Sequence, residues 1–233
     1  MRSMILGLVF NGLIGVPLTS ESAVVFDNGP PIVGVGGTAY VSETSASQWI
    51  AQDFLLPVGS TTVTDIHWWG TYFPPDDSIV DNFSVRFYAD RETPDFLGPV
   101  PFTDPFAVFD AAAVTRSATG QYIGAPGTPA YLQLFEFSVR IPDTSFLADT
   151  RYWLSIVSSY SQSPFQGWGW AISNFGGTHS YRFSESVEWR ASIDEMAFHL
   201  TNDYLSEVPE PGTVALLGLG LAGLGLSRRR KAA

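Results

Sequence analysis

The sequence predicts an all-β fold: a single antiparallel β-sandwich or jelly-roll-like domain, with a short membrane-targeting segment on each side. Three observations support this. Period-two alternation of hydrophobic and polar residues dominates from Trp49 to Leu200, which is typical of strands with one buried face. Turns rich in Pro, Gly, Asp and Ser separate the alternating runs. No amphipathic helix of ordinary length interrupts them, and β-branched and aromatic residues dominate throughout.

The alternating runs locate the expected strands. In residues 83–88, for example, Phe83, Val85 and Phe87 share one face and the residues between them share the other. Comparable runs cover residues 49–54, 63–73, 131–139, 152–157, 167–172 and 196–200. About eight to ten short strands with turns at this spacing favour a sandwich or jelly roll. Residues 24–47, rich in Gly and Ser, predict an irregular first strand and loop.

The chain divides into three predicted segments. Residues 1–23 combine a basic start, a hydrophobic run from Met4 to Leu18 and a small-residue exit at Ala23, as a secretory signal peptide does. Residues 24–207 form the β-sandwich domain, which is long enough to bury a core of its own. Residues 208–233 form a separate tail. It contains an uncharged Gly-, Ala- and Leu-rich stretch from Thr213 to Ser227.

The tail predicts a short transmembrane helix with a basic stop. A helix over residues 213–227 is about 22 Å long, less than the ~30 Å hydrocarbon core that a permanent anchor spans. The basic cluster follows at once and is expected to stay on the cytoplasmic side; it consists of Arg228, Arg229, Arg230 and Lys231. An ordinary single-pass anchor is the alternative to a segment that is recognised and removed.

The order of features in this tail resembles the PEP-CTERM sorting signal of Gram-negative bacteria. The motif residues are Val208, Pro209, Glu210 and Pro211; the short helix and the arginine cluster follow them. The resemblance implies recognition and cleavage by the membrane enzyme exosortase. It also implies an inner-membrane intermediate and a final location at the cell surface or in the extracellular matrix. It covers only residues 208–233.

The charge balance of the central domain excludes nucleic acid as a partner. The two end segments hold five of the 12 basic and two of the 23 acidic residues, so residues 24–207 carry 7 basic and 21 acidic residues, a formal charge near −14. Nucleic acid is excluded as a partner because a polyanion requires a basic surface.

The chain has no cysteine, which excludes thiol catalysis, thiolate metal sites and disulfides.

The central domain also resembles a recurrent secreted β-sandwich module of uncharacterised function. The resemblance covers most of residues 48–202 and implies no activity. It rests on the segments Gln52–Phe54, Ile66–Gly70, Phe83–Asp90, Tyr152–Ile156, Trp168–Trp170 and Met196–Phe198.

Seven tryptophans suggest a surface for polysaccharide. Sugar rings pack on exposed aromatic faces while polar neighbours bind the hydroxyl groups. The candidate glycan platform consists of Trp68, Trp69, Trp168 and Trp170. Adjacent residues of a regular strand point to opposite faces, so one of Trp68 and Trp69 is expected in the core and the other at the surface. Core burial is the alternative for Trp168 and Trp170.

No catalytic constellation is evident, and we expect a non-catalytic protein. His67, His179 and His199 lack the close spacing of metal ligands, and no Gly-x-Ser-x-Gly motif occurs. A secreted carbohydrate-active enzyme is the remaining alternative, because glycoside hydrolysis needs two carboxylates across a cleft. Its candidate acids are Glu136, Glu188, Asp194 and Glu195.

No cofactor is expected. A structural calcium ion is the weak alternative, since calcium binds oxygen-rich loops. Such loops occur at Asp27–Gly29, Asp76–Ser78 and Asp81–Asn82. None of them has the spacing of a known calcium loop, and Asp- and Asn-rich turns form without metal.

Overall fold

The computed structural model describes residues 23–203 except 75–78, 92–94, 96–97, 112 and 160–166. Within that part of the chain, no helix is long and hydrophobic enough to cross a membrane. Residues 1–22 of the predicted signal peptide, the sorting motif at 208–211 and the basic cluster at 228–231 lie outside the described residues, whereas Ala23, the predicted last residue of the signal peptide, begins β1.

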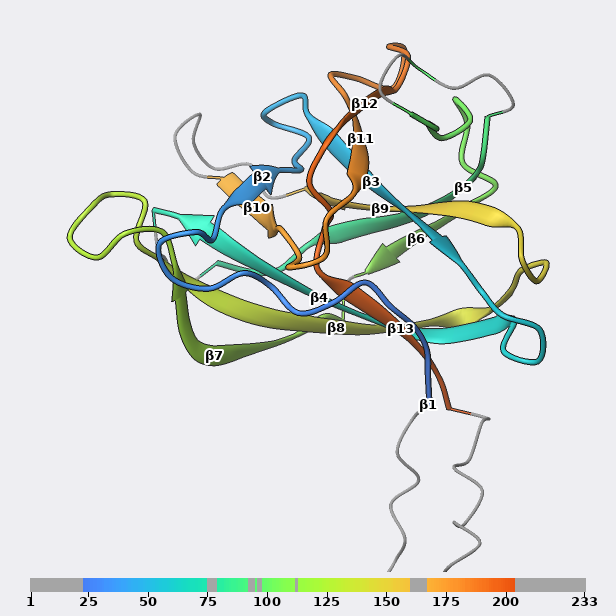
Figure 1. Ribbon diagram of the computed structural model, residues 1–233, viewed down its shortest axis with the longest axis horizontal. Coiled ribbons are helices and arrows are strands. Elements are labelled where there is room, and N and C mark those ends of the chain that lie inside the picture. The colour runs from blue at the N-terminus through green and yellow to red at the C-terminus, as the bar shows by residue number, and fades with distance from the viewer. Residues whose placement is uncertain are drawn as a thin grey trace, which may run out of the picture. The chain divides into compact units, whose positions relative to one another are not determined.

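Thirteen strands make up the described chain (Figure 1). Their bounds are β1 Ala23–Asp27, β2 Ala39–Val41, β3 Trp49–Leu55, β4 Thr62–Phe73, β5 Phe83–Ala89, β6 Ala107–Ala111, β7 Thr115–Ile123, β8 Leu132–Ser145, β9 Arg151–Ser158, β10 Gly167–Ala171, β11 Thr178–Arg182, β12 Arg190–Ile193 and β13 Phe198–Asn202.

The larger sheet is built on β4. On one side β4 pairs antiparallel with β8, which pairs in turn with β7. On the other side β4 pairs with two short strands in succession, β13 opposite residues 65–68 and β10 opposite residues 70–73. The strands β1 and β2 extend the sheet beyond β13 and β10. A single 12-residue strand therefore joins two separate arms of the sheet.

The second sheet has the strand order β12-β11-β3-β9-β5-β6, and every pairing in it is antiparallel. The two sheets pack face to face. Their inward-facing side chains form the main hydrophobic core between them. The predicted antiparallel β-sandwich is confirmed.

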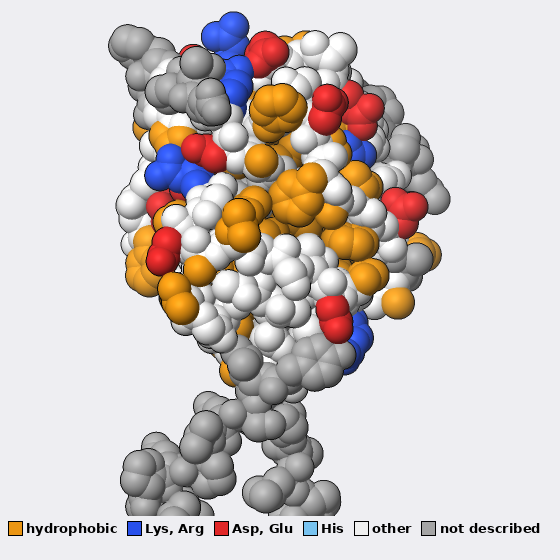
Figure 2. Space-filling view, turned by 90° about the vertical axis from the view of Figure 1, so that its right-hand side faces the viewer, with side chains coloured by type: hydrophobic (Ala, Val, Ile, Leu, Met, Phe, Trp, Pro, Cys, Tyr) orange, Lys and Arg blue, Asp and Glu red, His pale blue; other side chains and the backbone are white. Residues whose placement is uncertain are grey.

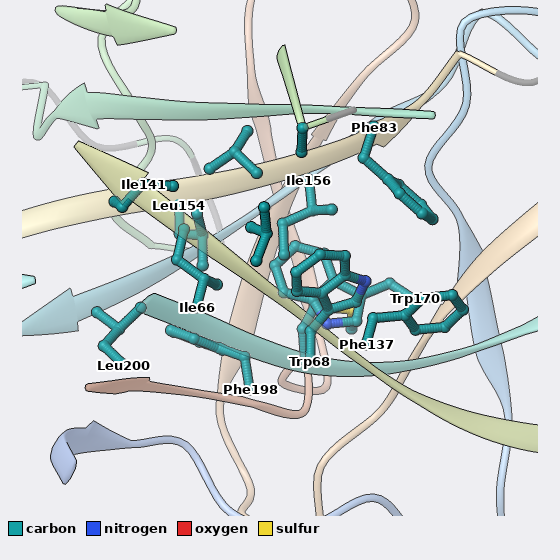
Figure 3. Close-up of a cluster of buried hydrophobic side chains, with 14 of the residues drawn as sticks. Ile66, Trp68, Phe83, Phe137, Ile141, Leu154, Ile156, Trp170, Phe198 and Leu200 are labelled. Atoms are coloured by element: carbon teal, nitrogen blue, oxygen red, sulfur yellow. The ribbon is translucent and has the colours of Figure 1, made fainter. Parts of the chain in front are cut away.

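Period-two alternation places the core side chains as predicted. Phe83, Val85 and Phe87 all belong to the main core, as do the inward residues of β8, β9 and β13. Figure 3 shows Trp68 and Phe137 among the aliphatic side chains of both sheets. Their rings stack at 5.6 Å between centroids. Such close aromatic packing adds to the free energy gained by burying the rings.

The structure has more strands than the eight to ten predicted. Strands β6, β7, β11 and β12 lie outside the runs located from the sequence. In β7 and β12 the side chains are largely exposed and show no hydrophobic alternation. In β2, only three residues long, none is fully buried. Strands of this kind are held mainly by backbone pairing with their neighbours, which leaves little signal in the sequence.

The smaller sheet is buried on both faces. Its outer face carries a second hydrophobic cluster, in which Trp49, Tyr88 and Trp153 come from strands while Val100 and Trp189 come from loops. The alternation in β3, β5 and β9 is therefore between two buried faces, which explains why aromatic residues occupy both sets of positions.

Glycine at position 70 is required by the packing of Trp168. A Cβ atom at Gly70 would lie 2.6 Å from the indole Nε1 of Trp168 and 2.7 Å from the carbonyl oxygen of Gly169. Real side chains do not approach so closely, and the backbone oxygen is held by strand pairing. We expect Gly70→Ala to lower the free energy of unfolding by about 1–3 kcal/mol, the usual cost of overpacking a core.

The control for this prediction is Gly176→Ala, because no atom lies within 4 Å of a Cβ built at Gly176. Its effect on stability should be within about 0.5 kcal/mol, as for an ordinary surface substitution. Urea denaturation followed by tryptophan fluorescence measures both. Equal stability of the two variants would contradict the proposed contact.

Candidate functional site

The predicted glycan platform is largely inside the protein. Trp68, Trp168 and Trp170 are each 0% exposed and belong to the main core. Their rings therefore cannot stack on a sugar, which corrects the prediction for these three residues. Trp69 is partly exposed and packs on the outer face of β4. The predicted opposite orientation of Trp68 and Trp69 agrees with these positions.

Trp69 borders a cluster on the outer face of the larger sheet. His67 on β4 and His199 on β13 stack at 4.3 Å between ring centroids, and the Trp69 ring lies 5.5 Å from that of His199. The Nδ1 atom of His67 is 3.8 Å from a carboxylate oxygen of Glu136 on β8. Strand pairing brings His67 and His199 together despite their separation in sequence.

Burial keeps the two histidines neutral. It lowers the pKa of His67, and it lowers the pKa of His199 to about 4, helped by the nearby His67 and opposed by Asp27. Two stacked imidazoles cannot both become charged at low cost, because like charges at this distance repel.

The acids considered for glycoside hydrolysis lie in different surroundings. Glu136 faces His67, whereas Glu188 forms an ion pair with Arg91 at the surface. Asp194 accepts a 2.7 Å hydrogen bond from the Tyr40 hydroxyl group. Burial and the charge of Asp53 raise the pKa of Glu195. These acids are engaged with different partners.

The oxygen-rich loops have protein partners instead of a metal geometry. Asp27 accepts a 2.8 Å hydrogen bond from the backbone N–H of Gly29. Asp81 accepts one of 2.6 Å from the Tyr72 hydroxyl group, while residues 76–78 lie outside the described residues. Among the residues that the structure describes, no group of three or more His, Cys, Asp or Glu is placed to hold a metal ion.

The chemically distinctive site is a cluster of arginines and aromatic rings on the outer face of the smaller sheet. The guanidinium carbons of Arg86 and Arg182 lie 4.1 and 4.6 Å from the same Trp49 ring centroid. Arg182 also lies 4.5 Å from the ring of Trp189. The negative faces of indole rings attract cations, and the attraction is larger where water is excluded.

Arg182 is 2% exposed and donates to neutral acceptors. Its Nη1 donates to the carbonyl oxygens of Thr103 at 2.9 Å and Glu185 at 3.3 Å. Its Nη2 donates to the Tyr88 hydroxyl oxygen at 3.2 Å. Its Nε is buried without a hydrogen-bond partner among the described residues. Burial lowers the pKa of Arg182, and the nearby charge of Arg86 acts in the same direction.

A pocket of about 270 Å³ opens beside the two arginines. It is lined by Arg86, Thr103, Asp104, Pro105, Val108, Arg182 and Glu185. The cationic groups lie deeper in the pocket than the carboxylates. The side chain of Arg86 is 14% exposed, whereas that of Glu185 is 68% exposed. Glu185 forms a 2.8 Å ion pair with Arg86, and Asp104 is also exposed. The pocket thus has a cationic floor and an acidic rim.

The alternation in the sequence placed Arg86 on the same face as Tyr88 but did not indicate a site. The pocket needs loop residues 103–105, in the connection from β5 to β6, and the turn at Glu185, which lies far from β5 in sequence. These parts come together only in the folded sheet. There β3, β9 and β5 pair in succession, and β11 pairs with β3 on the other side.

Hydrophobic side chains are also exposed on the surface of the domain. Figure 2 shows hydrophobic side chains gathered over the middle of the face that it displays, with charged side chains around them. One exposed hydrophobic side chain is Phe106, which is 50% exposed. Its ring lies 6.1 Å from that of Phe146 and 5.7 Å from that of Tyr152. The hydrophobic core therefore reaches the surface at Phe106.

Comparison with protein families identifies the described domain. The model of a family described as "Domain of unknown function (DUF7901)" matches residues 25–208. The chain belongs to this family. The match confirms the resemblance to an uncharacterised β-sandwich module and extends it to nearly the whole of the predicted domain. Searches of curated proteins and of solved structures gave no match.

A second family model, the PEP-CTERM protein-sorting motif, matches residues 207–231. This confirms the resemblance of the tail to that signal. The motif marks an exported protein that is sorted through exosortase.

The His67–His199 pair predicts a pH-dependent stability. The pKa of His199 is about 4 in the folded protein against 6.5 ordinarily, so the unfolded chain binds more protons between these values. Stability from this group is complete above pH 6.5 and is lost as the pH falls toward 4. We expect His199→Gln to remove about 1–3 kcal/mol of the loss measured between pH 7 and pH 4.

Urea denaturation at several pH values measures this effect. His179→Gln is less suitable as a control because burial also lowers the pKa of His179; Arg140→Gln, on the same face, changes a group that does not titrate in this range. An unchanged pH dependence in His199→Gln would show that His199 is readily protonated in the folded protein.

Proposed function

We propose that this protein is a non-catalytic component of the cell surface or extracellular matrix of a Gram-negative bacterium. The observation that carries the proposal is the sorting motif at residues 207–231 directly after the family domain at 25–208. The protein is made with a signal peptide, held at the inner membrane by its C-terminal helix and cleaved there by exosortase. The domain is then released outward.

The properties of the domain suit that location. A formal charge near −14 over residues 24–207 favours solubility. Stability comes from two buried hydrophobic clusters, so no disulfide is needed outside the cell. An antiparallel sandwich with this large a core is an ordinary scaffold for extracellular recognition.

Cleavage of the tail is tested by changing its motif. We expect the protein released by the native host to lack residues 213–233, and Glu210→Ala to retain them in the membrane fraction. Intact-mass spectrometry of both fractions measures the outcome. Glu188→Ala removes an acid of the domain and should be processed normally. A released protein with an intact tail would contradict the proposal.

A second candidate function is binding of polysaccharide. The pocket at Arg86 and Arg182 supports it, because sugar-binding sites combine a few polar groups with apolar walls, here Pro105 and Val108. The partly exposed Trp69 lies elsewhere, on the other sheet, and is no part of this pocket.

This second function predicts retention of the released protein on the exopolysaccharide of its own host. Arg86→Gln should reduce retention, because it removes a cation that lines the pocket, while Trp69→Phe should leave it unchanged. Affinity electrophoresis in gels that contain the polymer measures both. Equal mobility with and without polymer would exclude this function and would leave the sorting proposal untouched.

A further inference from the structure

In the part of the chain that the structure describes, no carboxylate lies within ion-pair distance of Arg182, and the charges of Glu185 and Asp104 act on it only from farther away. A guanidinium group has five N–H donors, and three hydrogen bonds of Arg182 reach two carbonyl oxygens and one hydroxyl group. Its Nε has no partner, and no carboxylate among the described residues forms an ion pair with it. Arg86 stacks on the same Trp49 ring and adds a second positive charge.

A buried charge without a counter-ion is costly unless a partner compensates it. The rings of Trp49, Tyr88 and Trp189 compensate part of the charge on Arg182, at 4.5–5.6 Å from its guanidinium carbon. They present no oxygen to the free N–H. Since Arg182 and Arg86 both line the pocket, an anion that enters there would place a negative charge beside the two guanidinium groups.

The rim restricts which anion fits. Asp104 and Glu185 line the same pocket and are exposed. These carboxylates only accept hydrogen bonds, so they repel a bare, highly charged ion and favour a ligand that offers hydroxyl donors. The ligand indicated is a molecule with one carboxylate at the floor and several hydroxyl groups at the rim.

We propose that this pocket binds the carboxylate of an acidic sugar, a uronic acid unit within a polysaccharide. Arg182 and Arg86 hold the carboxylate, Asp104 accepts hydrogen bonds from ring hydroxyl groups, and Pro105 and Val108 contact the apolar edge of the sugar. The proposal rests on the second candidate function and names its ligand class.

Glu185 has a distinct role in this arrangement. Its carboxylate pairs with Arg86 when the pocket is empty, so it competes with the incoming carboxylate. The pair is largely exposed on the Glu185 side, and exposed ion pairs are weak. The ligand can therefore displace it.

Calorimetric titration of the protein purified from the exporting cells, with trigalacturonic acid, tests the proposal. The matched ligand is methyl-esterified trigalacturonic acid, which keeps the sugar rings and their hydroxyl groups but replaces each charged carboxylate by a neutral methyl ester. Sodium sulfate is titrated separately to detect a site for any small anion. We expect binding of the free acid and at least about tenfold weaker binding of the ester, since a charge-assisted hydrogen bond is lost.

Variants separate binding from folding. Arg182→Met keeps the length and hydrophobicity of the side chain and should lower affinity for the acid at least about tenfold. If that variant does not fold, Arg86→Gln gives the same test at a less buried position. Glu185→Gln removes the competitor and should raise affinity, up to about fivefold. Arg140→Gln, on the other sheet, should change nothing.

Three results would overturn the proposal. The ester binding as tightly as the acid would show that the charge is not recognised. Sulfate binding as tightly as the acid would show a general anion site. A loss of affinity in Glu185→Gln would make Glu185 a ligand contact in place of a competitor. Retention of neutral host polysaccharide alongside any of these results would preserve the second candidate function.

Discussion

The fit of large indole rings between two sheets is the constraint on which the structure depends. Stacked sheets lie only about 10 Å apart, and Trp68, Trp168 and Trp170 all point into that space. The space is sufficient because Gly70 on β4 leaves room for the Trp168 ring. The pairing of β10 with β4 sets this contact. Since β4 also pairs with β8 and β13, an error at this point would affect both arms of the larger sheet.

The same demand for burial produces the pocket on the opposite side of the smaller sheet. Trp49, Trp153 and Tyr88 face away from the main core, and such large rings would be exposed on a sandwich of only two layers. Loops bearing Val100 and Trp189 cover them. Arg182 is buried within this layer of loops, where its guanidinium group stacks on two indole rings. Its charged end therefore lies beside the pocket. A recognition surface thus arises where a third layer of loops meets the sheet.

Much of the fold could be predicted because burial leaves a periodic pattern. The alternation put Phe83, Val85 and Phe87 on one face and predicted a strand over residues 196–200; the structure places these three residues and Met196, Phe198 and Leu200 in the core. Edge strands such as β7 leave no such pattern. The tryptophans misled the functional interpretation for a physical reason: an indole suits a sugar-binding surface and a tightly packed core equally well, and a single sequence does not separate the two. Arg182 could not be recognised as a site residue, since its importance depends on burial by segments distant in sequence.

The position of β13 bears on the order in which the exported chain assembles. This strand lies between β1 and β4, and Ala23 pairs with Asn202; Figure 1 shows β1 and β13 side by side. The first strand therefore has no neighbour to join until the last one has crossed the membrane. Bringing such distant segments together is entropically slow. Completion of the larger sheet therefore has to wait for β13, the last strand before the sorting motif.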